Sequence, residues 1–141
     1  MRFVLDNSVA MRWLLSDRAP DVQDYARGVL QLLANGNAAV VPNLFTLEAA
    51  NVLAKSQKRG LVTEAGARAF LALLADLDIE TDATTHERAL HDTLNIAMHH
   101  ELSAYDAAYL ELALREGLAL ATLDRDLSAA CVKAGGKCVQ P

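Results

Sequence analysis

The chain has 141 residues, of which 52% are hydrophobic, 22% charged and 5% aromatic, and its formal net charge is −5. This length suits a single domain, which we predict to span residues 1–141, and the apolar content excludes an intrinsically disordered chain. The acidic balance counts against a non-specific nucleic-acid binder, since such proteins usually present a basic face. It does not exclude a nucleic-acid substrate, because four acids that bind a metal would bring the sum from −5 to −1.

The sequence also predicts a cytoplasmic protein. The chain has two cysteines, Cys131 and Cys138. Two thiols do not make a disulfide framework in a chain of this size, so we expect free thiols in a reducing compartment. The N-terminus lacks the basic segment and long apolar run of a signal peptide. No stretch approaches the roughly 18 apolar residues of a membrane helix, so we expect no membrane association.

In the first half of the chain, short apolar runs alternate with amphipathic segments. Residues 2–5 form an apolar run, which is typical of a buried strand in a parallel sheet. Gly36 provides a left-handed end for a helix, and Asn43 is a plausible N-cap. The expected elements, in order, are a strand at 2–5, helices at 8–15 and 21–34, a strand at 38–41 and a helix at 44–59.

The second half of the chain continues this alternation. Thr63 and Ser103 are expected to cap helices, Thr84 and Glu87 have the spacing of a capping box, and Gly117 ends a helix. The expected elements are a helix at 63–75, a weak strand at 77–80, helices at 84–99 and 103–116, a strand at 118–123, a helix from 124 and an edge strand at 137–139. Such alternation predicts an α/β fold, a parallel sheet with helices on both faces.

Two acidic residues directly follow predicted strands. Asp6 ends the strand at 2–5, and Asp124 ends the strand at 118–123. In open α/β sheets, ligands bind at the carboxyl ends of the strands. If the two strands are neighbours, both carboxylates lie where the strand order reverses. Each residue could instead be the N-cap of the helix that follows it.

Two further acids lie on inward faces of predicted helices. Helical neighbours are three and four residues apart, so Glu48 shares a face with Leu44 and Val52. By the same spacing Asp106 shares a face with Tyr109. A boundary position for Glu48, and a capping box formed by Ser103 with Asp106, remain alternatives.

Taken together, the four acids predict a metal site. Like charges that converge at one edge of a sheet repel one another, and a hard divalent cation would relieve that repulsion. Magnesium and manganese suit a set of ligands made only of oxygen atoms. The histidines do not form an H-E-x-x-H zinc helix.

The segments that carry these acids resemble a known family. They are Val-Leu-Asp-Asn-Ser at 4–8, Leu-Glu-Ala-Ala-Asn-Val-Leu at 47–53, Ser-Ala-Tyr-Asp-Ala-Ala-Tyr-Leu at 103–110 and Ala-Thr-Leu-Asp-Arg-Asp-Leu at 121–127. In order and spacing this set resembles a PIN domain, and in particular the small ribonuclease toxins of VapBC toxin–antitoxin pairs. The four-part set is specific, whereas any one part is not.

This resemblance implies a three-layer sandwich around a parallel five-stranded sheet in the order 3-2-1-4-5. It implies an endoribonuclease that depends on Mg²⁺ or Mn²⁺, in which metal-activated water cleaves RNA. It also implies a homodimer and a cognate VapB-like antitoxin as partner. The residues carried over are the acids Asp6, Glu48, Asp106 and Asp124, with Ser8, Asn51 and Thr122 in support. Asp126 lies close enough to Asp124 to replace or assist it.

Other functions remain open at this stage. An acid-cluster phosphatase usually has a second aspartate two residues after the first, a position that Ser8 occupies here. A receiver-type module needs an acid pair after the first strand, which Asn7 does not supply. A catalytically silent PIN-like binding protein would share every motif and differ only in lacking metal-dependent activity.

Overall fold

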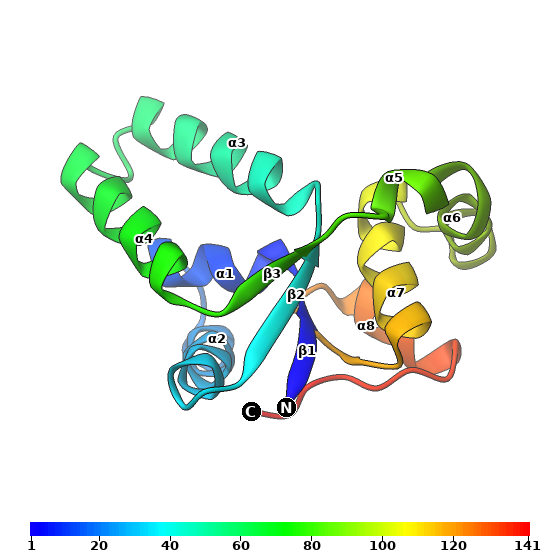
Figure 1. The fold of residues 1–141 in the computed structure, drawn as a ribbon. Helices are drawn as coiled ribbons and strands as arrows, with labels where there is room; N and C mark the ends of the chain where they lie inside the picture. The colour runs from blue at the N-terminus through cyan, green and yellow to red at the C-terminus, as the bar shows by residue number, and fades with distance from the viewer.

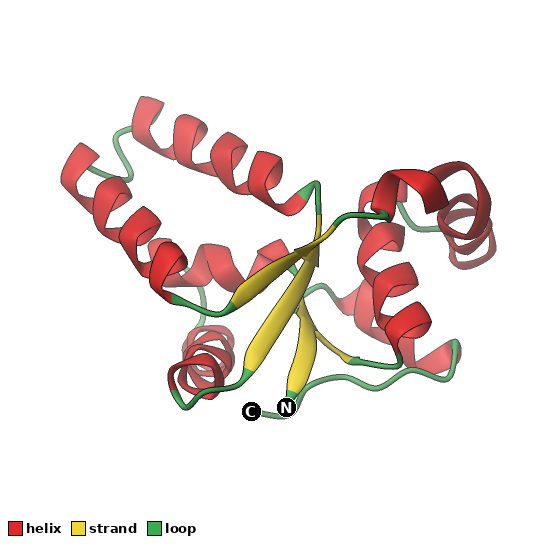
Figure 2. Ribbon diagram, in the orientation of Figure 1, coloured by secondary structure: helices red, strands yellow, loops and turns green.

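The structure, a computed structural model, describes residues 1–141 and is built around a four-stranded parallel sheet. The strands are β1 (Arg2–Leu5), β2 (Ala38–Pro42), β3 (Ile79–Asp82) and β4 (Ala119–Ala121). They lie in the order β3-β2-β1-β4, and every pair is parallel. The expected α/β class and the order of these four strands are confirmed (Figure 2).

Helices cover the sheet from both sides, which gives three layers (Figure 1). The first group is α1 (Asn7–Leu14), α2 (Pro20–Ala34), α3 (Phe45–Lys58) and α4 (Glu64–Asp76). The second group is α5 (Thr85–Arg88), the π-helical segment η1 (Ala89–Thr93), α6 (Leu94–His100), α7 (Ala104–Glu116) and α8 (Arg125–Lys133). No helix combines the length and apolar character needed to cross a membrane.

The central strand β1 is buried on both faces. Phe3, Val4 and Leu5 have no exposed surface, because β2 and β4 flank the strand and helices cover both faces. A strand buried on both faces has a continuous apolar sequence, which is the pattern that predicted it. The residue that follows, Asp6, therefore leaves the core at the carboxyl edge of the sheet.

Helix α7 has the caps that the sequence predicts. The Ser103 side chain accepts a hydrogen bond from the backbone N–H of Asp106 at 3.1 Å. At the other end Gly117 has φ 64°, a left-handed conformation that glycine adopts without strain. The residues from Ala107 to Ala113 are all buried, so α7 lies deep against the sheet.

An ion network fixes α7 to the edge strand β3. Arg115 bonds to Glu111 at 2.7 Å and to Asp82 at 3.0 Å, and all three side chains are largely buried. Burial alone would raise the pKa of Asp82. The hydrogen bonds from Arg115, Thr85 and Thr84 outweigh that effect and hold its pKa below the ordinary value.

Several expected boundaries are wrong. The third strand lies at 79–82 instead of 77–80, and the fourth shrinks to 119–121. The fifth strand is reduced to a single parallel bridge between Leu120 and Cys138, because this segment shares only two backbone hydrogen bonds with β4. The helix expected at 84–99 is three pieces with a π-helical centre.

Two expected caps are also absent. The Thr84 side chain makes no capping bond, and its hydroxyl donates to Asp82 instead. Helix α3 has Leu44 as its N-cap residue and no side-chain cap, so Asn43 does not play the expected role. The Thr84 hydroxyl is engaged by Asp82, and the Asn43 residue is exposed to solvent.

We predict that Ser103→Ala lowers the free energy of unfolding by about 1 kcal/mol, because one N–H at the start of α7 loses its acceptor. The matched control is Asn43→Ala, which removes a side chain with no capping bond and should change stability by less than about 0.5 kcal/mol. Urea unfolding measures both values. Equal losses for the two variants would contradict the cap assignment.

Candidate active site

Asp6 is a buried carboxylate between the ends of two strands. Its side chain follows β1, the residue is only 4% exposed, and its backbone N–H donates to the Ala121 carbonyl at 2.9 Å. Oδ2 accepts hydrogen bonds from Ser8 Oγ at 2.6 Å and from Thr122 Oγ1 at 2.7 Å. The side chain does not cap α1, which removes the simpler structural explanation for this acid.

The two hydroxyls are themselves held by the backbone. Ser8 Oγ accepts from the N–H of Leu123, and Thr122 Oγ1 accepts from the N–H of Asp124, both at 3.0 Å. Because an amide proton occupies the acceptor side of each hydroxyl, each hydroxyl proton is directed to Asp6. The arrangement therefore joins the end of β1 to the end of β4 through one carboxylate oxygen.

The protonation of Asp6 reflects this burial. Burial raises the pKa of Asp6 to about 6, the hydrogen bonds from Ser8 and Thr122 lower it, and the charges of Asp106 and Asp124 raise it further. The folded protein thus disfavours the ionised form of this carboxylate relative to water. A positive charge placed beside it would favour the ionised form.

Glu48 approaches the cluster from the first turn of α3. It is partly buried, and its Oε1 accepts a hydrogen bond from the Tyr109 hydroxyl at 2.5 Å. Burial raises the pKa of Glu48, the Tyr109 bond lowers it, and the charges of Asp6 and Asp106 raise it. Glu48 is therefore close enough to both aspartates to feel their charge.

Asp106 lies in the first turn of α7, where its own N–H is capped by Ser103. Burial raises the pKa of Asp106, and so does the charge of Asp124, while contact with Ser103 lowers it. The nearby charge of Asp126 raises it slightly more. Asp106 thus belongs electrostatically to the same cluster.

Asp124 has the capping role that was its simpler alternative. Its Oδ1 accepts from the N–H of Leu127 at 2.9 Å, which starts α8. The same carboxylate contributes to the raised pKa values of Asp6 and Asp106. Asp126 is exposed on the next turn, and Asn51 is exposed on α3 and takes no part in the hydrogen bonds of the cluster.

Tyr109 is the residue that sequence reasoning missed. The spacing predicts that Tyr109 lies on the inward face of α7 beside Asp106, but it assigns the side chain no part in the site. A buried tyrosine needs a partner for its hydroxyl, so its type was the available signal. The identity of that partner, Glu48, could not be read from the spacing because 61 residues separate the two.

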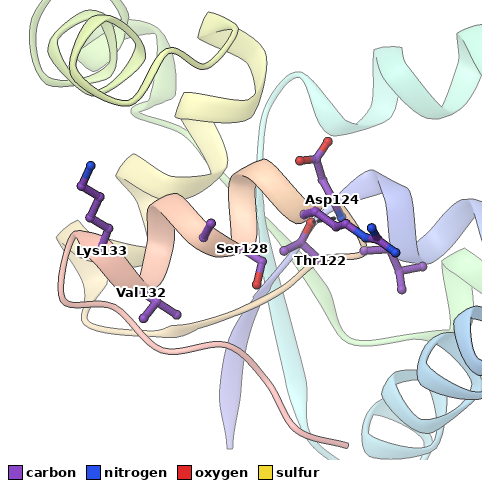
Figure 3. A pocket seen from close by; sticks show the side chains of 8 residues that line it. Thr122, Asp124, Ser128, Val132 and Lys133 are labelled. Atoms are coloured by element: carbon purple, nitrogen blue, oxygen red, sulfur yellow. Dashed lines mark hydrogen bonds between the residues drawn. The ribbon is translucent and has the colours of Figure 1, made fainter.

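Two pockets meet at Leu123 and Asp124. The smaller, of about 350 Å³, borders the acidic cluster and includes Arg12 and Arg18 in its lining. The larger, of about 680 Å³, follows α8 past Ser128 to Lys133. In Figure 3 the Asp124 carboxylate points away from Ser128 and Val132, and of the four acids only Asp124 lines the larger pocket.

The four acids lie at one edge of the sheet, but their carboxylates do not converge on a single metal position. As the side chains stand, no three acidic, histidine or cysteine residues are grouped closely enough to hold a metal ion. All four offer oxygen ligands of the kind that magnesium and manganese prefer. Burial is the main reason that the pKa values of Asp6, Glu48 and Asp106 are raised, and the charges of the neighbouring acids raise them further. A cation would offset that repulsion if the carboxylates came together.

The chain belongs to the PIN domain family. The model of that family matches residues 3–133, nearly the whole chain. The chain is similar to Ribonuclease VapC3 of Pyrobaculum aerophilum, with 36% identity over 86 residues. This alignment covers 61% of the chain and 66% of the relative, slightly under two thirds of the relative's length. The family expected from the motifs is confirmed.

Solved structures share the fold. The crystal structure of PAE2754 from Pyrobaculum aerophilum has a TM-score of 0.64 at 23% identity, covering 92% of this chain and 79% of that chain. VapBC2 from Rickettsia felis, bound to a DNA fragment from its promoter, has a TM-score of 0.59 at 16% identity, covering 88% and 89%. At these identities the likeness concerns the fold alone.

Asp6→Asn is predicted to stabilise the metal-stripped protein at neutral pH. The pKa of Asp6 rises from 3.8 to about 6 on folding, so its contribution to stability is complete below pH 3.8 and lost as pH rises through 6. An amide has no such loss. Between about pH 4 and pH 7 the stability difference should move by up to about 3 kcal/mol in favour of the variant.

Urea unfolding in EDTA at several pH values measures this difference. Asp17→Asn is the control, because Asp17 is exposed and its pKa is lowered, first by its hydrogen bond to Arg12. A stability difference for Asp6→Asn that does not change with pH would show that folding does not raise the pKa of this carboxyl group.

Proposed function

We propose that this PIN domain protein is a metal-dependent endoribonuclease that acts as the toxin of a VapBC-like toxin–antitoxin system. The observation that carries the proposal is the buried Asp6 carboxylate, which is oriented by Ser8 and Thr122 and interacts electrostatically with three further acids. Neither a helix cap nor an ion pair explains the burial of this charge, because Asp6 caps no helix and forms no ion pair. A function that brings a cation to the carboxylates does explain it.

The donor set fits a hard divalent cation. Both hydroxyl bonds go to Oδ2 of Asp6, which leaves Oδ1 for another ligand. Glu48 uses only Oε1 for Tyr109, and Asp106 forms no ion pair. Bound there, Mg²⁺ or Mn²⁺ would lower the pKa of a water molecule and offset charge on a phosphoryl group.

The chain's own residues have distinct tasks in this proposal. Asp6, Glu48, Asp106 and Asp124 hold the cation, with Asp126 available beside the last of them. Ser8 and Thr122 keep Asp6 oriented and favour its ionised form, because hydrogen bonds to a carboxylate lower its pKa. Asn51, an exposed polar residue one turn after Glu48 on α3, is assigned a supporting role. No histidine lies in this arrangement, so we assign none as a general base.

The smaller pocket gives single-stranded RNA a place to lie. Asp124 is the acidic residue of its lining and Ser8 lies in the same lining, whereas Arg12 and Arg18 border the pocket from α1 and the following loop. Because the net charge of the chain is −5, attraction of a polyanion has to be local. Two arginines beside the carboxylates would hold the phosphates next to the cleaved bond.

Partners follow from the same proposal. We propose a VapB-like antitoxin, a homodimer and action in the cytoplasm; the Rickettsia felis neighbour is itself a VapBC protein. Large apolar side chains stand exposed on two surfaces, Leu90 and Met98 on the π-helical segment and α6, and Leu47 and Leu61 around α3. Co-purification with the product of an adjacent gene, with the mass of the complex, tests these assignments.

The decisive experiment is cleavage of single-stranded RNA with and without Mg²⁺ or Mn²⁺. We expect cleavage by the wild type, none in EDTA, and at least about 100-fold slower cleavage by Asp6→Asn and Asp106→Asn, since even outer groups of metal sites cost 10- to 100-fold. Circular dichroism confirms that the variants fold. Leu71→Ala, an exposed position on α4, is a control that should retain full activity.

Two other results would replace the proposal. Hydrolysis of a generic phosphate monoester without RNA cleavage would favour an acid-cluster phosphatase. RNA binding without metal-dependent cleavage of any substrate would favour a silent binding module. Cleavage that persists unchanged in Asp6→Asn would remove the acidic cluster from the mechanism.

The arginine pocket gives a separate prediction. In the Asp6→Asn background, Arg12→Gln with Arg18→Gln should weaken binding of a single-stranded RNA oligonucleotide. The slope of log K against log salt should fall by about 1.4, which is two phosphate contacts at 0.7 each. Arg27→Gln with Arg68→Gln is the matched control, because each of these arginines is exposed and forms an ion pair within its own helix, α2 or α4. Equal slopes for both pairs would contradict the assignment.

A further inference from the structure

We propose that Tyr109 is a positioning residue whose hydroxyl holds Glu48 at the acidic site. This inference rests on the proposed function, because it assigns Tyr109 a role in preparing the site for a divalent cation. Nothing in the sequence pattern required such a role, since a buried aromatic residue on α7 is accounted for by packing alone.

The contact joins two helices that are distant in sequence. Tyr109 is fully buried on α7, and its hydroxyl reaches across to Oε1 of Glu48 on α3 at 2.5 Å. The hydroxyl also lies against the backbone of Asn7, the residue after Asp6. One oxygen atom therefore contacts the segments that carry Asp6 and Glu48, and it extends from the helix that carries Asp106.

The direction of this hydrogen bond is well defined. Burial raises the pKa of Tyr109 far above its ordinary value, and the bond to Glu48 raises it further. The hydroxyl thus remains a donor, and the Glu48 carboxylate remains the acceptor. A charged acceptor makes this bond stronger than one between neutral groups.

The bond opposes a repulsion. The Asp6 and Asp106 carboxylates lie close enough to act electrostatically on Glu48, and like charges repel one another. The Tyr109 bond is the only hydrogen bond or ion pair that the Glu48 side chain makes. Without it, a flexible glutamate at a partly exposed position would turn toward solvent, and an incoming cation would have to reorder it.

The bond also leaves a ligand free. Only Oε1 is occupied by Tyr109, so Oε2 can face the neighbouring acids. Groups that orient a metal ligand through its other atom commonly set the affinity of the site. Tyr109 has this relation to Glu48, as Ser8 and Thr122 have to Asp6.

The test is Mn²⁺ binding to metal-stripped protein without RNA, measured by titration calorimetry. Tyr109→Phe keeps the buried ring and removes only the hydroxyl. We expect its affinity for Mn²⁺ to fall 10- to 100-fold while the far-UV circular dichroism spectrum stays unchanged. Tyr105→Phe is the matched control on the same helix, because Tyr105 is 67% exposed, and its affinity should stay within about twofold of wild type.

A double-mutant cycle with Glu48→Ala separates positioning from a general structural effect. If Tyr109 acts through Glu48, then Tyr109→Phe causes no further loss of Mn²⁺ affinity in the Glu48→Ala background. An equal loss in both backgrounds would overturn the inference. So would wild-type affinity in Tyr109→Phe. If the wild type itself bound no Mn²⁺, the proposed function would fall first, which distinguishes the two failures.

Discussion

The site depends on two hydroxyl groups that share one oxygen atom of Asp6. Ser8 and Thr122 donate to Oδ2, and each hydroxyl oxygen accepts a hydrogen bond from a backbone N–H of the segment after β4. This arrangement requires β1 and β4 to be neighbours, which the strand order provides. It also keeps a charged group where burial disfavours charge. The fold accepts that cost at one residue and offsets part of it with hydrogen bonds, a balance typical of sites selected for function over stability.

The placement of the four acids could be predicted because it rests on local signals. An apolar run that stops at Asp6 marks the end of a buried strand, and a helical period places Glu48 and Asp106 on inward faces. Parallel strands then bring their carboxyl ends to one edge. Helix α7 was predicted almost to the residue, since Ser103 and Gly117 are local end signals that nothing in the tertiary structure overrides.

What the sequence did not predict depends on contacts between distant segments. Thr84 looked like a cap, but Asp82, fixed by Arg115 from α7, takes its hydroxyl. The edge strand near Cys138 was too short to pair beyond one bridge. The Tyr109 bond to Glu48 needed the positions of two helices at once. The sequence also could not predict the distances among the four carboxylates. Spacing indicates that the acids lie at one edge of the sheet, but it does not show whether they converge on one metal position.

The separation of Asp6 and Thr122 along the chain bears on when the site can exist during protein synthesis. These residues are 116 positions apart, and β4 is the last strand to be made. A nascent chain that still lacks its final quarter contains Asp6, Glu48 and the first three strands. It has neither the hydroxyl of Thr122 nor the carboxylate of Asp124. The complete acidic cluster therefore cannot form before the segment that carries Thr122 and Asp124 has been made, and until then the Asp6 carboxylate lacks one of its two hydroxyl donors.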